Sequence, residues 1–262
     1  MTDTKRDKDG EAAAVRAHET RTEIAANVDE VWRALTEPEE IERWFAPKMT
    51  VEPGVGGSVT ADWGSGIVWK TDIEIWEPNQ HLRLVETRDH FVGGAAPDGE
   101  PMEPCRLIQD YYLETVGGKT VLRLVHSGFG SGQAWDLEYE GTRGGWQQCF
   151  FRLREGLERH RGESVHNSLI AWRGHGVTYR EVLSGIEAGA SQRAEIALKG
   201  EYHFCGILPD LNGSVLCVSS QPTQGGAMAY IELILYGFSD VGAAEIGSGW
   251  KARLKELFPE PA

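Results

Sequence analysis

One pattern constrains the fold of this chain most: a long series of alternating apolar and polar residues, followed by a single long helical repeat. The alternation predicts strands with one apolar face, and it recurs over residues 59–63, 67–75, 82–84, 107–113 and 122–126. An apolar stripe at spacings of four, three and four residues then predicts a helix that ends near His160; it consists of Trp146, Phe150, Leu153 and Leu157. Because the apolar face of a sheet must be covered, the sequence predicts an α+β domain with this helix on an antiparallel sheet.

Changes of pattern divide the 262 residues into three parts. Residues 1–17 are mostly charged or small and are expected to form a disordered tail. Residues 18–162 are expected to form the first domain, and residues 166–258 a smaller, related α+β domain. In the smaller domain we expect a helix at Leu169–Trp172 and another one carrying Trp250. Strands are expected between these helices, over residues 194–198, 202–208, 214–219 and 228–236.

The charge balance narrows the classes of partner. The chain has 26 Lys and Arg against 40 Asp and Glu, a formal net charge of −14. An acidic surface repels phosphate groups, so we expect neither nucleic acid nor a membrane as a partner.

The polar start of the chain lacks the apolar region of a signal peptide, and the four cysteines form no Cys-x-x-Cys pair. We therefore expect a cytoplasmic protein whose cysteines are reduced thiols.

Several short motifs resemble a known family. In order along the chain they are Val31-Trp-Arg-Ala-Leu-Thr36, Glu42-Arg-Trp-Phe45, Val55-Gly-Gly57, Glu77-Pro78, Val125-His-Ser-Gly-Phe129 and Gly144-Gly-Trp146. With the order of elements they resemble the START-like (SRPBCC) superfamily and, within it, the family named after the activator of heat-shock protein 90 ATPase. The resemblance covers roughly Thr20 to His160, and residues 166–258 resemble a degenerate second half of some bacterial members. It implies a helix-grip fold, in which the sheet curls around the long helix and leaves a cavity between them.

Seven residues are predicted to line that cavity. Six lie on the sheet face that also carries Ile73 and Leu124, and the seventh begins the helical stripe. They are Trp63, Trp69, Thr71, Gln109, Tyr111, His126 and Trp146. An unpaired buried polar group costs ~1–3 kcal/mol, so Gln109, Tyr111 and His126 together favour a wet or ligand-filled space. We therefore expect the first domain to bind a hydrophobic or aromatic small molecule there.

Three other interpretations stay open. The three polar side chains could bond their neighbours in a solid core with no void of even ~100 Å³, and ligand binding would then be wrong. The cavity could be a cyclase- or hydrolase-like active site; its catalytic residues are unknown, and the candidate is His126 as acid or base, with Tyr111 or Gln109 polarising a carbonyl. The domain could also be a co-chaperone-like module with a protein partner.

No cofactor and no metal site are expected. The sequence has no P-loop, GxSxG or HExxH motif, and its eight histidines show no ligand-like pairing. In the eukaryotic activators that give the resembling family its name, a separate amino-terminal domain works beside this one. Only a short polar segment precedes the first predicted strand here. We therefore expect no strong stimulation of a heat-shock protein 90 ATPase.

Overall fold

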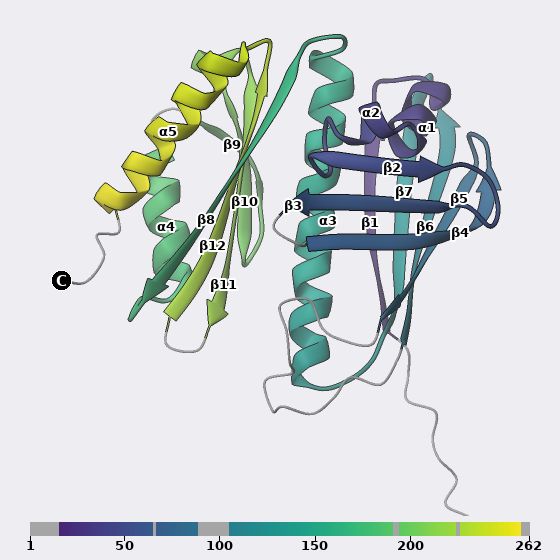
Figure 1. The fold of residues 1–262 in the computed structure, drawn as a ribbon, viewed down its shortest axis with the longest axis horizontal. Coiled ribbons are helices and arrows are strands. Elements are labelled where there is room, and N and C mark those ends of the chain that lie inside the picture. Colours follow the sequence, from purple (N-terminus) through teal and green to yellow (C-terminus); the bar gives the residue numbers. More distant parts are fainter. Residues whose placement is uncertain (1–15, 65–66, 89–104, 191–193, 224–225, 258–262) are drawn as a thin grey trace, which may run out of the picture.

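The computed structural model describes residues 16–64, 67–88, 105–190, 194–223 and 226–257, arranged as two domains (Figure 1). Residues 1–15 of the predicted tail lie outside the described residues. Arg16 and Ala17, the last two residues of that predicted tail, instead begin the first strand, because they pair with Phe129 and Ser127. The first domain runs in the order β1 (Arg16–Ile24), α1 (Val28–Thr36), α2 (Pro38–Ile41), β2 (Lys48–Glu52), β3 (Ser58–Gly64), β4 (Ile67–Glu77), β5 (His81–Arg88), β6 (Cys105–Val116), β7 (Lys119–Phe129) and α3 (Gln133–Arg159).

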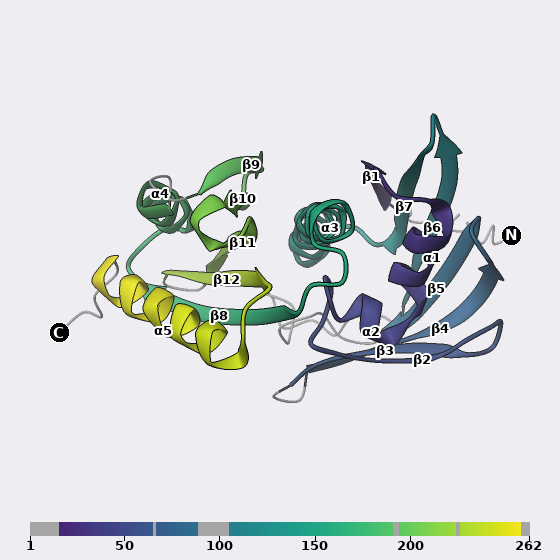
Figure 2. The same ribbon diagram turned by 90° about the horizontal axis from the view of Figure 1, so that it is seen from above.

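The strands of the first domain form one antiparallel sheet in the order β1-β7-β6-β5-β4-β3-β2. Figure 2 shows this sheet curving around α3, with α1 and α2 closing the space between them. The predicted stripe on α3 faces the sheet, since Trp146, Phe150 and Leu153 are buried in one core with Leu122 and Leu124. The predicted helix-grip fold is therefore confirmed.

The entry to α1 follows from a short sequence signal. Asn27 accepts a hydrogen bond from the backbone nitrogen of Glu30, and the Glu30 carboxylate accepts one from the backbone nitrogen of Asn27. This reciprocal pair satisfies two donors that the first turn of a helix leaves free. The cap places Val31 and Leu35 of α1 in the core above the sheet.

A bulge in β4 changes which residues reach the core. The register against β5 shifts between Ile73 and Ile75, so Ile75 is opposite Arg83 while Trp76 is opposite Leu82. Trp76 consequently packs edge-on against Trp32 of α1, with ring centroids 5.3 Å apart. The predicted alternation through Ile75 is wrong at its last residue for this reason.

The second domain is a smaller antiparallel sheet with helices on one of its faces. Its strand order is β8-β12-β11-β10-β9, and α4 and α5 share a core with it. The expected helix at Leu169–Trp172 is wrong, because these residues lie in β8 and pair along β12. The elements are β8 (Val165–His175), α4 (Tyr179–Ala190), β9 (Glu195–Lys199), β10 (His203–Leu208), the 3-10 turn η1 (Pro209–Leu211), β11 (Ser214–Thr223), β12 (Gly226–Tyr236) and α5 (Asp240–Leu257).

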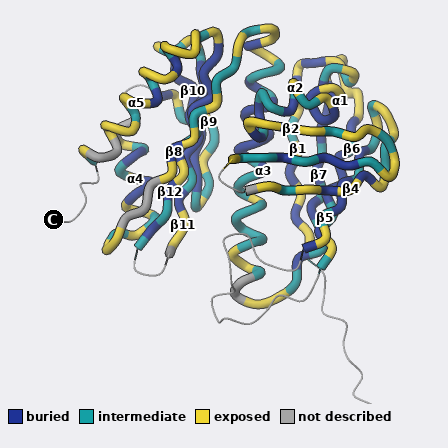
Figure 3. The backbone as a smooth tube through the Cα atoms, viewed as in Figure 1, coloured by how far each residue is buried: buried dark blue, intermediate teal, exposed yellow. Residues whose placement is uncertain are grey.

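Helix α3 lies between the two sheets (Figure 2). Its outer face carries Phe151, which packs with residues of β10, β11 and β12, among them Ile207 and Tyr236. The Arg152 guanidinium reaches the Glu232 carboxylate of β12. Because helices cover one face of the second sheet and α3 covers the other, every residue of β10 is buried (Figure 3).

The structure also corrects the expectation that all four cysteines are free thiols. Cys205 and Cys217 are directly opposite on β10 and β11, with Cα atoms 4.2 Å apart, and they form a disulfide. Cys105 and Cys149 are free. The pairing could not be seen in the sequence, because the two cysteines are twelve positions apart and only the strand register brings them together.

Candidate functional site

The first domain contains a cavity between its helices and the inner face of the sheet. Its volume is about 50 Å³. A single water needs roughly 10–15 Å³ on this measure, whereas ligand pockets span ~300–1,000 Å³. The cavity therefore has room for a few waters and is smaller than ~100 Å³, which is one of the two conditions that together would exclude ligand binding. The other condition, that Gln109, Tyr111 and His126 are all paired, is not met, because His126 Nε2 has no partner among the described residues. Its lining is mostly apolar and aromatic: Leu35, Ile41, Trp44, Phe45, Met49, Val59, Ala61, Trp69, Thr71, Leu82, Leu84, Glu86, Gln109, Tyr111 and Trp146.

Five of the seven predicted cavity residues belong to this lining: Trp69, Thr71, Gln109, Tyr111 and Trp146. The other two lie beside the cavity. Trp63 packs edge-on against Trp69 and Phe45, with ring centroids 4.6 and 5.3 Å away. His126 lies next to Trp146, whose indole ring is part of the lining.

Sequence reasoning missed the part of the lining that comes from α1, α2 and the turn after α2. Trp44 and Phe45 belong to this part, and their adjacency at the end of a short helix is the signal that could have found them. Trp44 also has a structural contact, since its indole nitrogen donates a hydrogen bond to the Ala34 carbonyl at 2.8 Å. The Phe45 ring is half-buried and lies parallel to the Trp146 ring, with centroids 5.5 Å apart.

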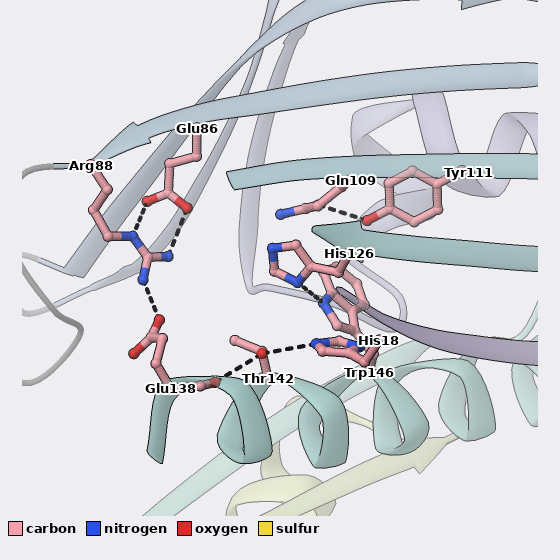
Figure 4. Close-up of polar contacts among 9 residues, drawn as sticks. All are labelled: His18, Glu86, Arg88, Gln109, Tyr111, His126, Glu138, Thr142 and Trp146. Atoms are coloured by element: carbon pink, nitrogen blue, oxygen red, sulfur yellow. Dashed lines mark hydrogen bonds and ion pairs between the residues drawn. The ribbon is translucent and has the colours of Figure 1, made fainter. Parts of the chain in front are cut away.

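Two neighbouring polar side chains of β6 contact each other in the cavity wall. The Tyr111 hydroxyl donates a hydrogen bond to Gln109 Oε1 at 2.9 Å (Figure 4). Burial raises the pKa of Tyr111 well above its usual value, so the hydroxyl keeps its proton. On the other side of the wall, Thr71 donates to the Val59 carbonyl and is satisfied within the sheet. Gln109 is therefore the polar group of the wall with hydrogen-bonding capacity to spare, because its amide NH2 is not used in the bond with Tyr111.

Two histidines lie side by side at the edge of this site. His18 of β1 and His126 of β7 are directly paired in the sheet, and their rings meet edge to face at 5.3 Å. Burial, with a smaller effect of Arg143, lowers the pKa of His18 to about 4. Burial also lowers the pKa of His126 well below 6.5, helped by His18 and Arg88. Both rings are therefore neutral near pH 7.

Hydrogen bonds hold each histidine in place. His126 Nδ1 accepts a bond from Trp146 Nε1 at 3.1 Å, and His18 Nε2 is 3.0 Å from the Thr142 hydroxyl (Figure 4). For His126 to act as a base it would have to give up its bond with Trp146, because a neutral imidazole has one acceptor nitrogen. Within the described part of the chain, His126 Nε2 and His18 Nδ1 are buried without a hydrogen-bond partner.

An ion cluster forms the polar end of the site. Arg88 donates to both oxygens of Glu86, at 2.8 and 2.7 Å, and its third nitrogen contacts Glu138 of α3 (Figure 4). All three side chains are largely buried. With two carboxylates and one guanidinium, the cluster has a formal charge of −1. Glu86 belongs to the cavity lining, so this charge lies close to any molecule in the cavity.

Two features are absent from the described residues: a metal-binding cluster and a membrane-spanning helix. Over the described ranges, His, Cys, Asp and Glu side chains do not gather into any group of three or more that could hold a metal ion. In the same ranges, none of the helices combines the length and the apolar character needed to cross a bilayer.

The family match lies within the first domain. The model of the family "Activator of Hsp90 ATPase homolog 1-like protein" matches residues 25–158, which is 134 of the 262 residues. No curated protein gives a significant match.

Similar solved structures include a protein from Mesorhizobium loti, which is 26% identical and has a TM-score of 0.45, with 53% of this chain and 95% of that one covered. The Aha1 dimer from Colwellia psychrerythraea is 19% identical, with a TM-score of 0.44 and coverage of 56% and 99%. DynU16, from the dynemicin biosynthetic locus, is 18% identical, with a TM-score of 0.43 and coverage of 92% and 97%.

Proposed function

Because this chain belongs to the family of activator of Hsp90 ATPase homolog 1-like proteins, we propose that its first domain uses the helix-grip fold to bind a small hydrophobic or aromatic molecule between the sheet and α3. The observation that carries the proposal is the lining of the cavity. Rings of Trp44, Phe45, Trp69 and Trp146 supply apolar contact area, and Gln109 supplies a polar group that can orient a ligand. No covalent intermediate is part of the proposal.

The volume of about 50 Å³ means that a ligand must displace a side chain. Phe45 is the lining residue best placed to move. It follows a helix of only four residues, and its ring is half-buried. The ring is held by stacking on Trp146 and by a tilted contact with Trp44. Rotation of this ring toward solvent would open the cavity and leave Trp146 as the surface on which an aromatic ligand stacks.

The expected affinity is modest. Burying ~200 Å² of apolar ligand surface contributes about 5 kcal/mol at ~25 cal/mol per Å². Association costs several kcal/mol, and displacing Phe45 adds to that cost. We therefore expect binding no tighter than about micromolar.

Native mass spectrometry of the purified protein tests the proposal, together with titration of the neutral apolar dye N-phenyl-1-naphthylamine. We expect either a retained mass that is lost on denaturation, or a rise in dye emission. Ala61→Leu adds three carbon atoms at the buried cavity wall and should abolish both signals. Val68→Leu, a substitution at an exposed position of the neighbouring strand, is the matched control and should preserve them. Absence of both signals in the wild-type protein would overturn the proposal.

A second candidate function is favoured by the small cavity itself. A first domain with room for only a few waters would act through its surface, as a co-chaperone-like module does. This function predicts no retained mass, no dye emission and a several-fold rise in the rate of a heat-shock protein 90 ATPase when the protein is added. An unchanged ATPase rate would rule out this form of the interaction function.

A further inference from the structure

Three polar side chains form a row across the inner face of the first sheet. His18 of β1 is directly opposite His126 of β7, and His126 is directly opposite Gln109 of β6. They are 5%, 2% and 7% exposed, so the row is buried from end to end. Side chains at directly opposed positions are ~4.5–5.5 Å apart at Cβ, which puts His126 and Gln109 within reach of one common ligand atom.

The hydrogen bond from Trp146 determines where His126 carries its proton. An indole nitrogen can only donate, so His126 Nδ1 must be the unprotonated acceptor. The proton of the neutral ring is therefore on Nε2. Among the residues that the structure describes, this buried N–H has no acceptor. Buried donors in native proteins are almost always paired, with protein, water or a ligand.

Gln109 offers a second donor beside the first. Its carbonyl oxygen is taken by the Tyr111 hydroxyl, so its NH2 group is at the opposite end of the amide. In Figure 4 this NH2 group and His126 Nε2 both lie on the side that faces the Glu86–Arg88 pair, and the two residues are directly paired in the sheet. Two N–H donors directed at one point are suited to an oxygen atom that accepts two hydrogen bonds.

We propose that His126 Nε2–H and the Gln109 amide together bind the oxygen of a neutral carbonyl group on the ligand. The inference rests on the proposed function and specifies its ligand class: an apolar or aromatic ketone, ester or amide. His126 does not line the cavity, so the proposal requires the carbonyl oxygen to reach past Gln109, which does line it, toward His126 Nε2.

The charges around the site select a neutral oxygen over a carboxylate. Glu86 and Glu138 surround Arg88, so the Arg88 guanidinium is already occupied by two carboxylates. The cluster has a formal charge of −1, and it disfavours a second anion at short distance. Both histidines are neutral and add no positive charge to offset this repulsion.

Two probes of nearly equal shape test the inference: acetophenone, and α-methylstyrene, in which a CH2 group replaces the carbonyl oxygen. Binding is followed by NMR on the 15N-labelled full chain, through the imidazole Nε2–H signal of His126. We expect acetophenone to bind about tenfold more tightly and to shift this signal, because two net hydrogen bonds form. Benzoate should bind more weakly than acetophenone.

Variants locate the effect. His126→Leu should reduce the affinity for acetophenone to that for α-methylstyrene, and Gln109→Leu provides the same test if the first variant does not fold. His81→Leu is the matched control, since His81 is bonded to Asp110 on the outer face of the same sheet and should leave the preference unchanged.

The outcomes separate the two proposals. If both probes bind equally and the His126 signal does not move, the cavity binds ligands but the donors hold only water, and the carbonyl inference is wrong. If benzoate binds more tightly than acetophenone, the choice of a neutral oxygen is wrong. If neither probe binds, the carbonyl inference is wrong, and the retained mass and the dye signal decide whether the proposed function fails with it.

Discussion

The contact between Arg152 of α3 and Glu232 of β12 makes a strong prediction about how the two domains depend on each other. The Arg152 side chain is 9% exposed and donates to Cys149 Sγ as well as contacting Glu232, whose side chain is 32% exposed. Glu232→Gln removes the negative charge and leaves a buried guanidinium without a counter-ion. Loss of one partner from a buried pair costs ~3–5 kcal/mol. Because Glu232 is partly solvated, we expect a smaller loss of about 2 kcal/mol in the free energy of unfolding.

Arg152→Met should cost less, although it removes the same ion pair. It leaves Glu232, which is a third exposed and can be solvated, while the methionine fills the apolar space beside Phe151. We expect a loss below about 1 kcal/mol. The order of the two losses is the prediction, since it depends on which charge is buried.

Urea unfolding followed by circular dichroism measures both losses, from the midpoint at constant slope. The double variant Arg152→Met/Glu232→Gln completes the cycle and should be more stable than Glu232→Gln, because it leaves no buried guanidinium without a counter-ion. If Arg152→Met is as destabilising as Glu232→Gln, or more so, the reasoning about the buried guanidinium is refuted.

Three further predictions concern the first domain. The pKa of His18 is about 4 in the folded protein and about 6.5 in the unfolded chain, so below pH 6.5 the unfolded chain binds the extra proton first. The contribution of His18 to the free energy of unfolding is therefore fully present above pH 6.5 and is lost as the pH falls toward 4. Thermal melts should show a loss of ~2 kcal/mol over this range, and His18→Gln should reduce that loss. Gly128→Ala should lower the free energy of unfolding by at least ~2 kcal/mol, because φ at this residue is +105° and a Cβ would overlap the Arg106 carbonyl. Gly145 lies on α3 with open space around it, so Gly145→Ala should raise the free energy of unfolding by up to ~1 kcal/mol in the same urea titration. Asn27→Ala should lower the free energy of unfolding by about 1 kcal/mol through loss of the α1 cap, and an unchanged urea midpoint would contradict this.

Much of the first domain could be predicted because its signals are local. The period of two along β6 and β7 places Gln109, Tyr111 and His126 on one face, and the structure buries all three there. The stripe from Trp146 to Leu153 likewise determines which side of α3 meets the sheet. Side-chain direction repeats along a strand or helix, so these faces follow from the order of residues alone.

Other features of the candidate site depend on contacts between distant residues. No spacing in the sequence indicates that the Trp146 indole bonds to His126, or that Phe45 closes the cavity from the turn after α2. The bulge in β4 is also invisible in the alternation, yet it turns Trp76 rather than Ile75 toward Trp32. Each of these depends on how two elements meet, and a local period carries no information about that.

The second domain shows the limit most clearly. The sequence alone predicted a smaller α+β unit with short strands. It did not predict that Leu169–Trp172 lies in strand β8 instead of a helix, or that Cys205 is opposite Cys217. The sequence determined that α3 has one apolar stripe toward the first sheet; only the tertiary structure decided that Phe151 and Arg152, on its opposite side, meet a second sheet. The physical reason is that a residue's own neighbours along the chain set the direction of its side chain, whereas burial of that side chain requires a surface supplied by residues many positions away.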